Sequence, residues 1–150
     1  FQHGHTYAAN PLSCAVGEAV VSELIENDLM NNATEMGGYL MAKLKELANS
    51  NQIIGDIRGK GLLLAAELVA NKETKEMLPV ECRGVYRLVE IGIENGLLLY
   101  TRKTSGGVFG EWVMITPALT INRSEVDELI DLLRITFLQF EKELKSQKYI

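Results

Sequence analysis

The segment IIGDIRGKGLLLAAELV, residues 53–69, is apolar towards both ends and carries glycines in its middle. It holds two short apolar runs on either side of Gly59-Lys60-Gly61, and glycines in that place suit a tight turn or a bulge between strands. A phosphate-binding P-loop is longer and is followed by Ser or Thr, which this turn lacks. The stretch therefore predicts two neighbouring strands joined by a structural turn.

Helical patterns lie on both sides of these strands. Asn10 can cap a helix and Pro11 suits a first helical position, because proline lacks the N–H that would be unsatisfied there. The run Asn122-Arg123-Ser124-Glu125 has the spacing of a capping box, and Gly96 suits the position just after a helix. From these signals and the apolar periodicity, helices are predicted over about residues 11–29, 33–48 and 80–95 and from 122 onward.

Two further strands complete the pattern. LLLYTR at 97–102 and EWVMITPAL at 111–119 are predicted strands, and the glycine-rich segment KTSGGVFG at 103–110 is predicted to be a flexible loop. The resulting order is α-α-β-β-α-β-β-α. It predicts an α+β fold in which a small mixed or antiparallel sheet is covered by helices on one face.

Composition excludes several classes of function. The 150 residues suit one domain, and the net charge of −5 argues against nucleic acid as a partner. No apolar run approaches the roughly 20 residues of a membrane span. Cys14 and Cys82 are far apart in the sequence and resemble neither a disulfide framework nor a metal pair, so we expect free thiols and a cytoplasmic protein.

The opening loop, residues 1–10, concentrates polar chemistry ahead of the first predicted helix. His3 and His5 flank Gly4, but a metal site needs further ligands and the chain has no other histidine, so no metal site is expected. Thr6 offers a hydroxyl beside backbone N–H groups and could hold a phosphate. The alternative is a threonine that simply closes an ordinary loop.

Two arginines differ in their setting. Arg102 ends the predicted strand LLLYTR and enters the glycine-rich loop, where it could form a bidentate pair with a carboxylate. The alternative is a solvated surface arginine. Arg58 stands beside Asp56 between strand segments and is expected to form a structural ion pair.

Four separated segments of the chain resemble, in the same order, the C-terminal portion of class III aminotransferases: residues 3–24, 54–69, 96–102 and 115–133. These pyridoxal-phosphate (PLP) enzymes include ω-amino acid:pyruvate, diaminopelargonate and ornithine aminotransferases. The resemblance implies that residues 1–150 are the small, C-terminal domain of a fold type I subunit. It also implies that residues 1–30 are the interface loop and helix that connect to a large PLP-binding domain, which lies N-terminal to this stretch in the family.

The resemblance also assigns roles to site residues. In the family, the threonine of the HTY-like motif binds the PLP phosphate of the neighbouring subunit in a homodimer; that residue is Thr6, with the main chain of His5 helping. The strand-end arginine that pairs with the substrate carboxylate corresponds to Arg102. Other members carry a carboxylate-binding arginine just before the PxL segment, where this chain has Met114. This departure favours an ω-transaminase.

The expected activity is therefore transfer of an amino group from an amine or ω-amino acid to a keto acid such as pyruvate. The lysine that carries PLP, the aspartate at its ring nitrogen and the stacking aromatic cannot be identified in this chain, so the chain alone is expected to be inactive. One alternative is a stand-alone α+β module that binds or senses a small molecule without catalysis. Another is a class III homologue with different chemistry, such as racemisation or decarboxylation.

Overall fold

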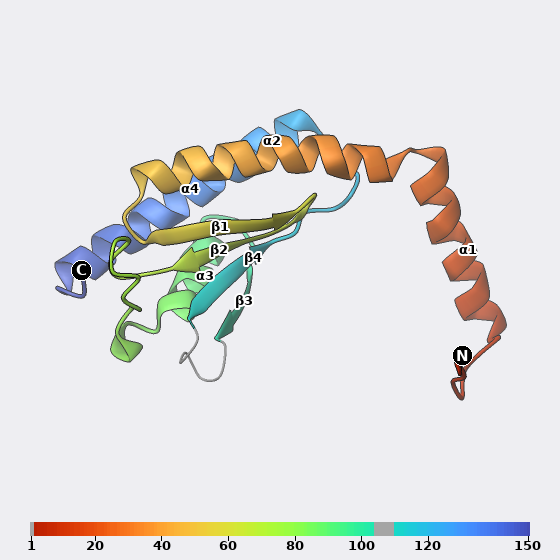
Figure 1. The fold of residues 1–150 in the computed structure, drawn as a ribbon, viewed down its shortest axis with the longest axis horizontal. Coiled ribbons are helices and arrows are strands. Elements are labelled where there is room, and N and C mark those ends of the chain that lie inside the picture. The colour runs from red at the N-terminus through yellow and green to blue at the C-terminus, as the bar shows by residue number, and fades with distance from the viewer. Residues whose placement is uncertain (1, 104–109) are drawn as a thin grey trace.

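A computed structural model describes residues 2–103 and 110–150 and follows the predicted order of elements (Figure 1). The elements are α1 (Pro11–Glu26), α2 (Leu29–Ser50), β1 (Ile54–Lys60), β2 (Leu63–Leu68), a 3-10 turn η1 (Val80–Cys82), α3 (Gly84–Glu94), β3 (Tyr100–Lys103), β4 (Glu111–Ile115) and α4 (Arg123–Ser146).

The four strands form one antiparallel sheet in the order β1-β2-β4-β3, which confirms the predicted α+β class and selects the antiparallel alternative. Residues 53–69 form the predicted pair of strands, with Lys60 opposite Leu63 at the turn. Helices α2, α3 and α4 pack on one face of the sheet (Figure 1). The core between helices and sheet includes the fully buried Leu40, Leu64, Ala66, Val113, Phe137 and Phe140.

The helix starts follow local chemistry. At α4, the Asn122 side chain accepts a hydrogen bond from the Glu125 N–H at 3.1 Å, and the Glu125 carboxylate accepts one from the Asn122 N–H at 2.9 Å. This confirms the capping box. Between α1 and α2 the chain turns at Asp28, whose φ of +50° lies in the left-handed region. The predicted first helix therefore ends at Glu26, three residues early, and α2 begins at Leu29.

Some predicted boundaries shift around α3. Arg83, in the left-handed region with φ +53°, separates the 3-10 turn from α3, where one continuous helix was predicted. Gly96 has φ +83°, as its position after the helix predicted. The Leu97 N–H donates to the Gly92 carbonyl at 2.7 Å, so this segment still belongs to the helix end and β3 begins only at Tyr100. Residues 104–109 of the predicted flexible loop lie outside the described residues.

Helix α1 stands apart from the rest of the chain (Figure 1). None of its residues is buried. Five of its large apolar side chains are 54–75% exposed: Leu12, Val16, Val20, Val21 and Ile25. Within the described residues, none of the helices has the length and apolar character needed to cross a bilayer.

Candidate functional site

The opening loop forms a short turn at the free end of α1. The Ala8 N–H donates to the His5 carbonyl at 3.0 Å, and Ala9 has φ +57°. The Asn10 side chain then accepts from the Ser13 N–H at 3.1 Å, which caps α1 as predicted. The fold therefore gives this loop a defined backbone even though its side chains are exposed.

The chemistry of this loop fits a bound phosphate. Thr6 is exposed, and within the described residues its hydroxyl has no hydrogen-bond partner, so it is available to an anion. The rings of His3 and His5 meet edge to face with centroids 4.6 Å apart. No group of three His, Cys, Asp or Glu side chains that could hold a metal ion occurs among residues 2–103 and 110–150. The donors present suit an anion held by neutral N–H and O–H groups.

The sheet has a second, open face that none of the helices within residues 2–103 and 110–150 covers. Antiparallel pairing sets side chains of this face in two rows across the strands. One row is Asp56, Glu67, Trp112 and Arg102, and the next is Arg58, Ala65, Met114 and Tyr100. A hollow of about 500 Å³ lies over this face, lined in part by Arg58, Leu63, Ala65, Trp112 and Met114.

Arg102 lies on β3 at the end of the first row. It is exposed and stands opposite Trp112 in the register. Its Nε–H donates to the hydroxyl of Tyr100 at 3.2 Å, because residues two apart on a strand share a face. Within the described residues this is its single hydrogen bond, which leaves the four terminal N–H groups for a ligand.

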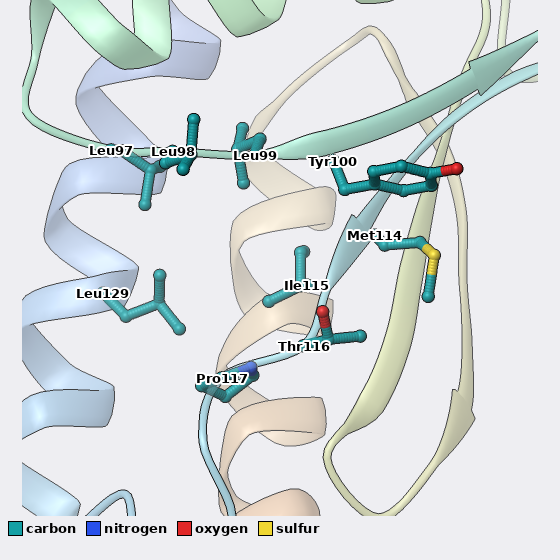
Figure 2. A pocket seen from close by; sticks show the side chains of 9 residues that line it. All are labelled: Leu97, Leu98, Leu99, Tyr100, Met114, Ile115, Thr116, Pro117 and Leu129. Atoms are coloured by element: carbon teal, nitrogen blue, oxygen red, sulfur yellow. The ribbon is translucent and has the colours of Figure 1, made fainter. Parts of the chain in front are cut away.

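An apolar hollow of about 370 Å³ adjoins Tyr100 at the edge of the sheet. Figure 2 shows Tyr100 beside Met114, with Leu97, Leu98 and Leu99 along the approach to β3 and Pro117 and Leu129 opposite them. Tyr100 therefore stands between an apolar cavity and the guanidinium of Arg102. Such a neighbourhood suits a ligand with an apolar part and a carboxylate.

Arg58 is a structural ion-pair partner, as predicted. Its guanidinium contacts the carboxylates of Asp56, at 2.9 Å, and Glu67. Hydrogen bonding to Glu67 and then to Asp56 raises the pKa of Arg58. Because two carboxylates already occupy this arginine, it is a poorer receptor for a further carboxylate than Arg102.

The chain does not bring its candidate residues together. His5 and Thr6 lie at the free end of α1, while Arg102 lies on the sheet (Figure 1). Tyr100 and Trp112 were not predicted as neighbours of Arg102. The i, i+2 spacing on a predicted strand could have indicated Tyr100, whereas Trp112 depends on a strand register that the sequence does not specify.

Comparison with known proteins gives a consistent match. The family model described as aminotransferase class-III matches residues 1–137. The chain is 37% identical over 146 residues to the uncharacterized aminotransferase YodT of Bacillus subtilis, covering 95% of this chain and 32% of that protein. It is 33% identical over 141 residues to the leucine/methionine racemase of Thermococcus litoralis, covering 93% and 30%. The chain thus spans about a third of the length of the curated relatives it matches.

Solved structures match the fold equally well. A transaminase from the marine bacterium Virgibacillus aligns with a TM-score of 0.87 at 28% identity, covering 95% of this chain and 31% of that one. An (S)-enantioselective ω-transaminase from Thermomicrobium roseum aligns at 0.80 and 31% identity, covering 93% and 30%. The taurine:2-oxoglutarate aminotransferase of Bifidobacterium kashiwanohense, in complex with PLP and glutamate, aligns at 0.80 and 26%, covering 95% and 31%.

Proposed function

Because this chain belongs to the class-III aminotransferase family, we propose that it is the C-terminal domain of a longer PLP-dependent aminotransferase. The whole enzyme moves an amino group from an amine or ω-amino acid to a keto acid such as pyruvate. The observation that carries the proposal is the family match over residues 1–137, which spans both the opening loop and Arg102. The PLP-bound relative of the same fold supports the cofactor.

The proposed arrangement places residues 1–150 as the small domain and residues 1–30 as its connection to the large domain. Helix α1 supports this, because its large apolar side chains are exposed in this chain and isolated apolar helices are seldom left in water. We further propose that the enzyme is a homodimer of the cytoplasm. Among the described residues neither Cys14 nor Cys82 forms a disulfide, which suits a reducing compartment.

In this proposal Thr6 holds the phosphate of PLP bound by the neighbouring subunit. Its hydroxyl donates to a phosphate oxygen, and the main chain at His5 contributes beside it. The turn at Ala8 and Ala9 fixes the path of this loop before Asn10 starts α1. When bound, PLP supplies the electron sink for amino-group transfer.

Arg102 receives the carboxylate of the substrate. Its terminal N–H groups can form the two parallel hydrogen bonds that an arginine makes to a carboxylate. The side chain is exposed and long, so it can also move aside for an amine without a carboxylate. Met114 lies near Arg102 on the open face, at the position where other family members carry a carboxylate-binding arginine. An apolar residue at this position suits the ω-transaminase type.

The proposal is tested on the full-length enzyme that contains this chain. Its visible absorption should be that of bound PLP, should fall when an amine donor is added and should return with pyruvate. A full-length protein that takes up no PLP would refute the proposal and favour a non-catalytic binding module.

One relative favours a second candidate function. The similarity to a leucine/methionine racemase makes racemisation the competing chemistry. Chiral analysis separates the two: a racemase interconverts the enantiomers of an amino acid without a keto-acid acceptor, whereas a transaminase requires the acceptor.

The role of Thr6 predicts a specific loss of affinity. In the full-length enzyme, Thr6→Ala should raise the dissociation constant of PLP about 10- to 100-fold, because one hydrogen bond to a charged phosphate is lost. Thr6→Ser keeps the hydroxyl and should retain most of the affinity. Equilibrium dialysis against free PLP measures both variants, and equal affinities in Thr6→Ala and the wild type would refute this role.

A further inference from the structure

We propose that Tyr100 is a positioning residue that determines which edge of the Arg102 guanidinium receives the substrate carboxylate. This inference rests on the proposed role of Arg102. It concerns the geometry of that contact and the class of substrate that depends on it.

The contact between the two side chains is local and built into β3. Tyr100 and Arg102 are two residues apart on one strand, so both project from the open face. The Tyr100 hydroxyl accepts the Nε–H of Arg102 at 3.2 Å. The Tyr100 ring is opposite Met114 in the register and borders the apolar hollow (Figure 2). Packing against Met114 thus restrains the ring that carries the hydroxyl.

The hydrogen bond changes what Arg102 can offer. A guanidinium has five N–H donors, of which one is Nε–H and four are on the two terminal nitrogens. A carboxylate can bind side-on, using Nε–H and one terminal nitrogen, or end-on, using both terminal nitrogens. Because Tyr100 occupies Nε–H, the side-on edge is engaged and the end-on edge remains open. The carboxylate therefore docks at the tip of Arg102.

Across the strand, Trp112 stands opposite Arg102 in the register, so the two residues are cross-strand neighbours on the open face. With Nε–H bound to Tyr100, the two terminal nitrogens of Arg102 remain the open edge of the guanidinium. A substrate without a carboxylate cannot form this contact with Arg102. Loss of the Tyr100 hydroxyl should therefore raise KM for keto acids and not for simple amines.

The test is steady-state kinetics of the full-length enzyme with pyruvate as acceptor and a carboxylate-free amine as donor. Tyr100→Phe keeps the ring and removes the hydroxyl. It should raise KM for pyruvate about two- to fivefold, the effect of losing one solvent-exposed hydrogen bond, with little change in kcat or in KM for the amine. The inhibition constant of propionate, a carboxylate that cannot react, should rise by the same factor. Tyr86→Phe, the same change on α3, is the matched control.

The variant Arg102→Gln distinguishes a failure of the proposed role of Arg102 from a failure of the proposed role of Tyr100. If Arg102→Gln leaves KM for pyruvate and propionate inhibition unchanged, the role of Arg102 is wrong and the role of Tyr100 falls with it. If Arg102→Gln weakens both while Tyr100→Phe changes neither, Tyr100 is not a positioning residue and the role of Arg102 stands. Equal effects of Tyr100→Phe and Tyr86→Phe, or an equal loss for amine and keto acid, would also overturn the inference.

Discussion

Replacing two adjacent glycines of α2 by alanine, one at a time, should change the free energy of unfolding in opposite directions. Gly37 is buried where α2 crosses the turn between β1 and β2, and a Cβ there would overlap the main-chain carbonyl of Gly61. Gly61 cannot easily withdraw, since it has φ +56° and a Cβ placed on it would itself lie 3.3 Å from the Ala33 carbonyl oxygen. A Cβ at Gly38 meets no atom within 4 Å. The two positions share a helix and differ only in the face they present.

The expected magnitudes follow from this difference. Replacing a helical glycine by alanine stabilises by about 0.5–1 kcal/mol where space allows, so Gly38→Ala should raise the free energy of unfolding by that amount. At Gly37 the same gain is opposed by overpacking against main-chain atoms, which costs up to about 3 kcal/mol. We expect Gly37→Ala to be destabilising by about 2 kcal/mol.

Urea denaturation of both variants, followed by far-UV circular dichroism, measures the two changes against the wild type. Gly38→Ala is the matched control, since it carries the same propensity gain without the overlap. The reasoning would be refuted by a Gly37→Ala variant at least as stable as the wild type. That result would mean that α2 can separate from the turn without loss of stability.

Two further predictions concern acid stability and thiol exposure. Hydrogen bonds from Arg87 to Glu143, at 2.8 and 2.7 Å, lower the pKa of Glu143. The pair therefore stabilises the folded chain at pH values above the unfolded-state pKa of Glu143. This contribution is lost as the pH falls through the folded-state pKa. Glu143→Gln should therefore lower the free energy of unfolding by up to about 1 kcal/mol at neutral pH, and this difference from the wild type should shrink in acid. Urea midpoints measured across a range of pH check this. A difference that stays constant with pH would contradict it. Cys14 is exposed and Cys82 buried, so a thiol reagent should modify only Cys14 in the native chain and both after denaturation, as mass spectrometry can show. In the full-length enzyme Cys14 should become protected if α1 is covered there, and rapid labelling of Cys82 in the native chain would contradict the burial.

Local signals predicted the parts of the fold that depend on neighbours in sequence. The glycine-bearing turn at 59–61 and the capping box at Asn122 and Glu125 involve residues within a few positions, and both formed as expected. The turn at Asp28 was missed because aspartate adopts the left-handed region without requiring it, and no glycine marks the place. Periodicity alone continued the first helix through it.

The apolar pattern of α1 shows the limit of such reasoning. Leu12, Val16 and Ile25 recur at helical spacing and predict a buried stripe, yet all three are exposed. Periodicity predicts that a helix has a side to bury, but the burying surface need not belong to the same chain. The relatives are about three times as long, so the remaining two thirds of such an enzyme are available to cover it.

The two candidate site residues lie on surfaces that the described part of the chain leaves uncovered. Thr6 is at the free end of α1, and Arg102 is on the open face of the sheet (Figure 1). A self-contained binding module would be expected to gather its polar ligands in one cleft, because converging groups provide both affinity and orientation. Here the groups diverge, and the surfaces that carry them also expose apolar side chains: Val16 and Val20 along α1, Leu63 and Tyr100 on the sheet. This divergence supports the proposal that other parts of the longer enzyme and a partner subunit complete two separate sites, one in which Thr6 contacts the cofactor and one in which Arg102 contacts the substrate.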